Sequence, residues 1–168
     1  MSQLRPIYAA DAIDAIGMQR GRMDSLRASQ MLESNLRDGR SVRRIFGPKD
    51  ILRLAIVDAL TNSGCTLKVA NRTSHSLDTI SQLAEVGSLW ADKIFAGKPT
   101  PEVFLLWLTG PDGSVIDVEH RTGIDRAAAV VSDWILKRPA IGFEQIGRAN
   151  VSAIGRKVAA KLRERGCL

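Results

Sequence analysis

Four arginines lie within eight positions of the stretch RDGRSVRR, residues 37–44, and this group is the feature whose chemistry most clearly suggests a function. The four are Arg37, Arg40, Arg43 and Arg44. The turn dipeptide Asp38-Gly39 lies among them. Guanidinium groups form strong charge-assisted hydrogen bonds with phosphate oxygens, so a loop of this composition can contact a nucleic-acid backbone. A solvated loop that contacts nothing is the alternative interpretation.

A second basic group occurs earlier, in a segment with helical periodicity at about residues 19–30. Its arginines are Arg20, Arg22 and Arg27. The apolar spacing of residues 8–16 predicts a helix before it, which Gly17 would end. This helix-glycine-helix order is compatible with a helix-turn-helix motif, whose second helix contacts base edges in the major groove. An ordinary exposed helix face is the alternative for these arginines.

Residues that could catalyse a reaction or bind a metal are sparse in this sequence. The only histidines are His75 and His120. Asp117 and Glu119 lie close to His120 in a predicted strand, but the two-residue period places His120 on the opposite face, which is poor geometry for a metal site. The glycine patterns of P-loops, dinucleotide-binding folds and nucleophile elbows do not occur. We therefore expect no enzymatic activity, no metal site and no cofactor.

The composition is that of a globular protein: of 168 residues, 45% are hydrophobic and 25% charged. The net charge of +6 is uneven, since residues 1–75 carry 12 basic and 7 acidic side chains, whereas residues 76–140 carry 6 and 9. A basic N-terminal part suits an anionic partner without proving one. Two distant cysteines and no apolar run of 18 residues predict a cytoplasmic protein outside the membrane.

The remaining pattern predicts a mainly α-helical chain with a small β component. We expect a helix that starts at Pro48 and stops at residues 62–64, and a further helix that begins near Thr66. A helix over residues 76–96 and a linker at 97–101 follow. Residues 103–109 and 114–120 predict a β-hairpin around the turn Gly110-Pro111-Asp112-Gly113. Helices are expected at about 125–137, with Pro139 beyond the end, and at 144–165.

Residues 44–70 resemble the centre of the MerR-type transcription regulators. That family reads Arg, any residue, then Tyr or Phe, and after a short turn Asp-Leu opens a helix that is followed at a fixed interval by Gly and a Ser/Thr-Leu pair. The matching residues are Arg44-Ile45-Phe46, Gly47-Pro48-Lys49, Asp50-Ile51, Gly64 and Thr66-Leu67. Their spacing is ungapped, and Tyr8, Ile13, Ile16 and Gly17 resemble the family's first helix and turn.

The resemblance implies a winged helix-turn-helix domain at residues 1–75 that binds double-stranded DNA in a sequence-specific way as a homodimer. Residues 37–44 would form the wing and contact phosphates. Residues 76–98 would form a connecting helix, and residues 99–168 an α+β domain for dimerisation or for sensing a small-molecule or protein effector. The alternative is a winged-fold adaptor or anti-activator that binds protein instead of DNA.

Overall fold

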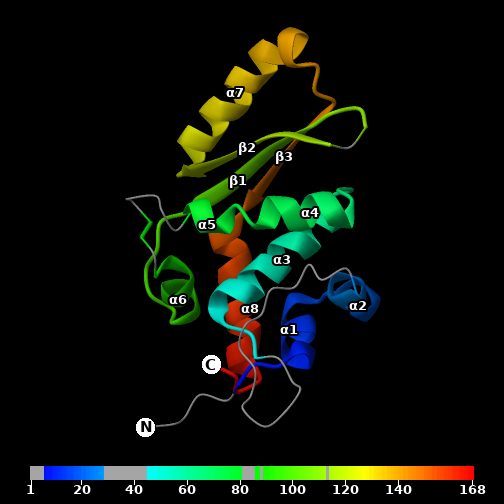
Figure 1. The fold of residues 1–168 in the computed structure, drawn as a ribbon. Helices are drawn as coiled ribbons and strands as arrows, with labels where there is room; N and C mark the ends of the chain where they lie inside the picture. Colours follow the sequence, from blue (N-terminus) through cyan, green and yellow to red (C-terminus); the bar gives the residue numbers. More distant parts are fainter. Residues whose placement is uncertain (1–5, 29–44, 81–85, 88, 113) are drawn as a thin grey trace.

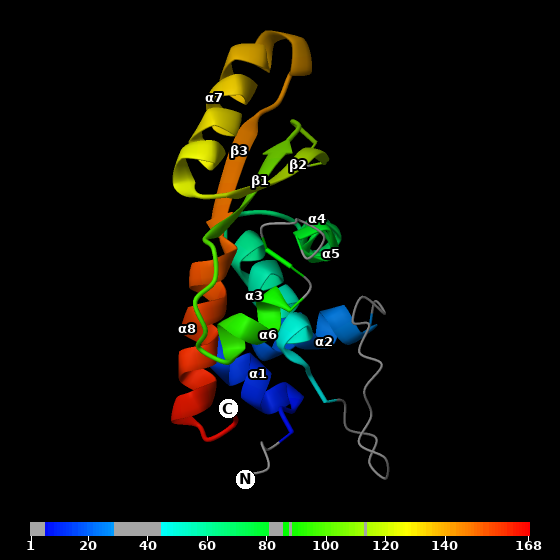
Figure 2. The same cartoon turned by 90° about the vertical axis from the view of Figure 1, so that its left-hand side faces the viewer.

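The computed structural model describes residues 6–28, 45–80, 86–87, 89–112 and 114–168. The described part of the chain is mainly helical and contains a three-stranded antiparallel sheet, which confirms the predicted fold class as mainly α-helical with a small β component. The sheet lies between helix α7 on one side and a group of helices on the other (Figures 1 and 2). The predicted wing at residues 37–44 lies outside the described residues, and both the wing and the MerR-like helix-turn-helix assignment stay predictions.

The first two helices are α1, Ala9–Ile16, and α2, Arg20–Ala28, as predicted. Gly17 joins them in a left-handed conformation with φ of 82°, which glycine adopts without steric cost. Its N–H donates to the carbonyl of Ile13 at 2.8 Å and so caps α1. The tight turn sets α2 at an angle to α1 (Figure 1).

Helix α3, Pro48–Asn62, is the central helix of the structure. Pro48 occupies its first turn, and the Asp50 carboxylate accepts a hydrogen bond from the N–H of Gly47 at 3.0 Å. Its buried residues occur on every side of the helix, because helices α1, α4, α6 and α8 surround it. They are Ile51, Leu52, Leu54, Ala55, Ile56, Val57, Asp58 and Leu60.

The helices between α3 and the sheet are shorter, and separated by more breaks, than the sequence predicts. Helix α4, Leu67–Ser74, begins as expected at Thr66, whose hydroxyl accepts from the N–H of Val69 at 3.3 Å. The single helix predicted over residues 76–96 is wrong, since the structure has α5, Leu77–Ile80, and a separate α6, Trp90–Phe95. Gly87 lies between them with φ of 79°, and a residue in that conformation cannot continue a right-handed helix.

The sheet has the order β2-β1-β3, with β1, Val103–Thr109, in the middle and β2, Val115–Thr122, beside it. These two strands form the predicted hairpin. The other edge strand is β3, Gln145–Asn150, where the sequence predicts the start of a helix; that prediction is wrong for residues 145–150. The helix is α8, Val151–Glu164, and it begins where the Asn150 side chain accepts from the N–H of Ala153 at 2.9 Å.

Strand β1 is buried along its whole length because both faces of the sheet are covered. Alternate side chains enter two different hydrophobic cores, as the two-residue period of a strand requires. Val103, Leu105 and Trp107 belong to the core of the helical group. Phe104, Leu106 and Leu108 belong to a smaller core beneath α7.

Helix α7, Ile124–Ile141, is longer than predicted and contains Pro139 in its last turn. The residue that follows its end is Gly142, which has φ of 67° and so takes the left-handed conformation that commonly terminates a helix. Glycine rather than proline therefore marks the end of this helix, which corrects the boundary expected at Pro139.

Helix α8 returns the C-terminal part of the chain to the N-terminal helices. It packs against α1, α3 and α6, and its Val158, Ala159 and Leu162 lie in the same core as residues of α1 and α3. One core therefore includes residues on both sides of the expected boundary at residue 98. Within the described part of the chain, no helix combines the length and the apolar character that are needed to cross a membrane.

We predict that Gly147→Ala strongly destabilises the protein. Gly147 pairs with Trp107 across the sheet, and a Cβ atom at this position would overlap the indole ring. Trp107 is buried and has little room to move, so the free energy of unfolding should fall by about 2–3 kcal/mol, as for other overpacked sites. Urea denaturation would measure this. The matched control is Gly21→Ala in α2, where nothing lies near the added methyl group and stability should rise slightly.

We also predict that His120 makes the protein less stable in acid. His120 is only 8% exposed, and burial, with a smaller contribution from the Arg121 cation, lowers its pKa from 6.5 to about 4. Between these two pKa values the unfolded chain binds a proton at His120 that the folded chain does not bind. The contribution of neutral His120 to the free energy of unfolding is therefore fully present above pH 6.5 and is lost as the pH falls towards 4. A shift from 6.5 to about 4 corresponds to a loss of at most about 3–4 kcal/mol. His120→Gln should flatten this part of the stability-pH curve, and an equally steep curve in that variant would contradict the prediction.

Candidate nucleic-acid interface

Helix α2 presents two of the predicted arginines on one flank. Met23 and Leu26 are fully buried and attach the helix to the core, whereas Arg20 and Arg27 are exposed. Arg20 and Arg27 are seven residues apart, which is close to two helical turns, so both project from the same side. Arg27 lies 3.6 Å from the Asp24 carboxylate, an exposed pair of little energetic weight.

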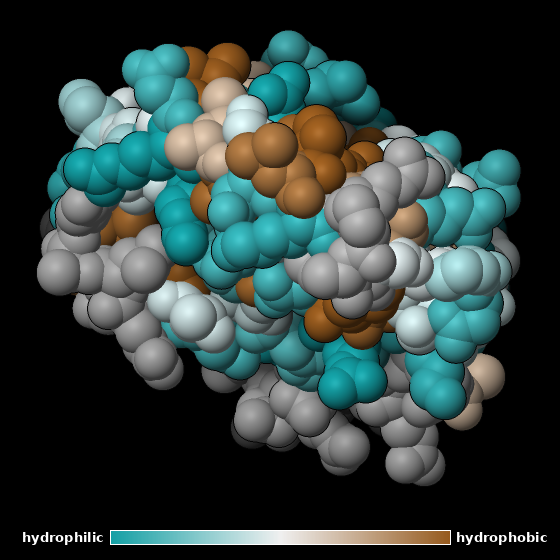
Figure 3. Space-filling model, turned by 90° about the horizontal axis from the view of Figure 1, so that it is seen from above, coloured by the Kyte–Doolittle hydropathy of each residue, from teal (hydrophilic) through white to brown (hydrophobic). Residues whose placement is uncertain are grey.

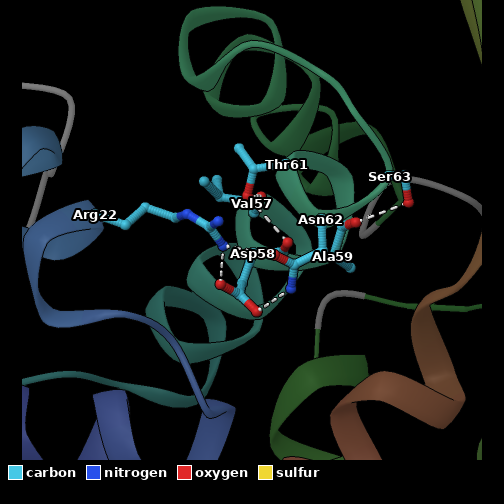
Figure 4. A network of polar contacts seen from close by, with 7 residues as sticks. All are labelled: Arg22, Val57, Asp58, Ala59, Thr61, Asn62 and Ser63. Carbon is cyan, nitrogen blue, oxygen red and sulfur yellow. Dashed lines mark hydrogen bonds and ion pairs between the residues drawn. The ribbon is translucent and has the colours of Figure 1, made fainter.

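Arg22 lies on the opposite flank of α2 and faces the protein. Its guanidinium donates to Asp58 Oδ1 and, at 3.1 Å, to Asn62 Oδ1, both on α3 (Figure 4). Asn62 Nδ2 in turn donates to Asp58 Oδ2 at 2.9 Å. In this arrangement Arg22 holds α2 against α3, a role that the sequence did not suggest for it.

Asp58 explains why this contact is needed. It is only 7% exposed, within a helix whose other buried residues are apolar. A buried carboxylate is costly unless a cation and hydrogen-bond donors surround it, and here Arg22 and Asn62 provide both. A single acidic residue inside an apolar helical pattern was the available sequence signal for a buried partner.

Several other cations of the described chain are already engaged by the protein itself. Lys49 and Arg53 of α3 both pair with Asp78, and the bond from Lys49 is the main reason that the pKa of this carboxyl lies below its usual value. Arg165 of the C-terminal segment pairs with Asp14 of α1 at 2.8 Å, and Arg156 of α8 pairs with Glu102. Arg20, by contrast, makes no ion pair with any residue that the structure describes.

The structure therefore shows the positions of only some of the arginines that are predicted to contact DNA. Arg20 and Arg27 share an exposed flank, and Arg22 is directed into the protein. The predicted wing residues lie outside the described residues, so their convergence with α2 stays a prediction. They are Arg37, Arg40, Arg43 and Arg44.

Side chains that could bind a metal ion or react as thiolates are sparse in the described part of the chain. No group of three or more His, Cys, Asp or Glu side chains there could hold a metal ion. Cys65 and Cys167 are both free thiols. Burial raises the pKa of the Cys65 thiol, which lowers its thiolate fraction and hence its reactivity.

Neither a protein-family model nor a curated protein sequence matches the chain.

We predict that Arg22 contributes much more to stability than Arg20. Removing the guanidinium in Arg22→Ala leaves Asp58 buried without a cation, which should lower the free energy of unfolding by about 2–4 kcal/mol. Arg20→Ala, a loss of the same side chain from the exposed flank, should change stability by no more than about 0.5 kcal/mol.

The double variant Arg22→Leu with Asp58→Leu tests the cause, because it removes both charges. It should recover much of the stability that Arg22→Ala loses. Urea denaturation of all three variants measures the effect, and equal stability of Arg22→Ala and Arg20→Ala would show that the contact with Asp58 does not hold α2 in place.

Proposed function

We propose that this protein is a sequence-specific transcription regulator that binds double-stranded DNA through α2. The observation that carries the proposal is the arrangement of α2: two arginines project from its exposed flank while a third anchors the helix to α3. A helix that is attached to the protein on one side and cationic on another suits insertion into a groove lined with phosphates.

The proposed roles of the arginines follow from their positions along α2. Arg20 starts the helix, and in helix-turn-helix proteins the N-terminal residues of the second helix approach the base edges. Arg27 lies near the other end, where a guanidinium can contact the backbone phosphates. The wing arginines would add phosphate contacts on a neighbouring element, as the MerR resemblance implies.

The proposal includes a homodimer, because a dimer with two-fold symmetry makes twice as many contacts with a palindromic DNA site as one copy does. The outer side of α7 offers a surface for a second copy. Ile124 and Ile135 are each more than half exposed there, and Leu136 is 81% exposed. An apolar patch bordered by hydrophilic residues is visible on the side of the molecule where α7 lies (Figure 3).

DNA binding of this kind would take place in the cytoplasm.

A protein-binding adaptor is the second candidate, and two observations favour it. The apolar residues on α7 suit a protein partner. Arg22 is directed into the protein, which leaves fewer cations on α2 for a nucleic acid. DNA binding itself distinguishes the two candidates.

We predict that binding to duplex DNA weakens steeply with salt and that α2 accounts for part of this dependence. Each phosphate contact contributes about one unit to the slope of log affinity against log salt, so Arg20→Gln with Arg27→Gln should reduce the slope by about two. Fluorescence anisotropy with a random-sequence duplex of about 20 base pairs, at several salt concentrations, measures this.

The matched control is Lys157→Gln with Lys161→Gln on α8, which removes the same charge from a helix on the other side of the molecule (Figure 2). This variant should keep nearly the full slope. Failure of the wild-type protein to bind any duplex at low salt would rule out the proposal in favour of the adaptor. An equal decrease in both double variants would show that α2 is not the contact surface.

A further inference from the structure

The two edge strands of the sheet differ in how their outer backbone groups are used. On β2, side chains of the strand itself occupy these groups. The Asp117 carboxylate accepts from the N–H of Val118 at 2.8 Å, and the Arg121 guanidinium donates to the carbonyl of His120 at 2.8 Å. Charged side chains at an edge protect it against pairing with another chain. The outer edge of β2 is therefore a poor surface for a partner strand.

The outer edge of β3 is open. Because Val118 directs its N–H away from β1, the facing residue Trp107 directs its own backbone groups towards β3, where it lies opposite Gly147. The residues on either side of that glycine, Ile146 and Arg148, consequently direct their N–H and C=O groups outward. These groups have no hydrogen-bond partner among the residues that the structure describes. Such an edge is a template for one more strand.

The side chains at this edge complement a second copy of the same strand. Two antiparallel strands related by a two-fold axis at Ile146 place Ile146 opposite its own copy, and Glu144 opposite Arg148 of the other copy. Glu144 and Arg148 are both exposed, and neither forms an ion pair with a described residue. Opposite charges in facing positions stabilise a strand pair. A pairing centred on Arg148 would instead place two arginines opposite each other.

The position of the Arg148 side chain agrees with this pairing. Its guanidinium carbon lies 6.0 Å from the centre of the Phe104 ring, which belongs to the core beneath α7. The charge is therefore held over that face of the sheet and does not extend across the open edge. A facing strand can approach the backbone of β3 without displacing it.

Helix α7 adds an apolar flank on the β3 side. Ala129 and Asp133 line a groove together with β2 and so mark the β2 side of the helix. At about 100° per residue, Ile124, Ala128 and Ile135 lie on the opposite flank, towards β3. The two isoleucines are each 56% exposed. A two-fold axis perpendicular to the sheet keeps both copies of α7 on the same face, so these flanks would face each other across the paired strands.

We propose that a second copy of this chain binds along the outer edge of β3, antiparallel to it and centred on Ile146, so that the two sheets become continuous. The ion pairs between Glu144 and Arg148 fix the register, and the flanks of α7 add apolar area. The inference rests on the homodimer of the function proposed above and identifies the surface that forms it. Dimer formation is measured without DNA, so a failure of this interface and a failure of DNA binding are separate results.

Sedimentation velocity of the full chain at low salt, where surface charges are screened least, tests the proposal. The wild type should show a concentration-dependent equilibrium between monomer and dimer. Arg148→Glu and Glu144→Arg each place like charges opposite each other twice in the dimer, so each should raise the dimer Kd at least about tenfold. The double variant Glu144→Arg with Arg148→Glu restores opposite charges and should return the Kd to within about threefold of the wild-type value.

Lys157→Glu is the matched control, since it changes the net charge as Arg148→Glu does at an exposed position of α8 outside the strand. It should dimerise as the wild type does, and a circular dichroism spectrum of each variant confirms that the fold is kept. A wild type that stays monomeric at about 100 μM, unchanged Kd in both single variants, or no recovery in the double variant would each overturn the proposal. Duplex DNA bound by a wild type that stays monomeric would overturn this interface and leave α2 as the DNA contact.

Discussion

The burial of β1 on both faces is the constraint on which the rest of the structure depends. Its side chains are divided between two hydrophobic cores, so α7 is needed on one face and the helical group on the other. Trp107 adds a local requirement, because its indole ring occupies the space where the neighbouring strand would carry a side chain. Only glycine fits at position 147, and β3 and β1 can approach each other only because glycine is there.

The position of α2 follows from the same constraint through a chain of contacts. The sheet contacts α8, α8 packs against α3, and α3 holds α2 through Asp58 and Arg22. The last of these links is electrostatic, whereas the others are mainly apolar. Because a buried carboxylate strongly favours its cation, this one ion pair fixes the direction of α2 more specifically than Met23 and Leu26 can by packing alone.

Local signals made much of the fold predictable. Gly17, Pro48 and Thr66 mark helix boundaries by rules that need no tertiary information, and the boundaries of α1, α3 and α4 follow them. Strand β3 was not predictable in this way, because its only evident requirement is a glycine opposite Trp107, a residue some forty positions earlier. The inward direction of Arg22 was missed for the same reason, since its partner Asp58 lies 36 residues away.

Net charge is a poor guide to binding in this protein because many of its cations are used internally. Lys49 and Arg53 neutralise Asp78, and Arg163 donates to the carbonyl of Phe95 at 2.6 Å, where it caps the end of α6. A cation that already has a partner must break that contact before it can bind a ligand, so it contributes less affinity than its charge suggests. The surfaces that can attract an anion are therefore set by where acidic partners are missing, which the composition of the chain cannot reveal.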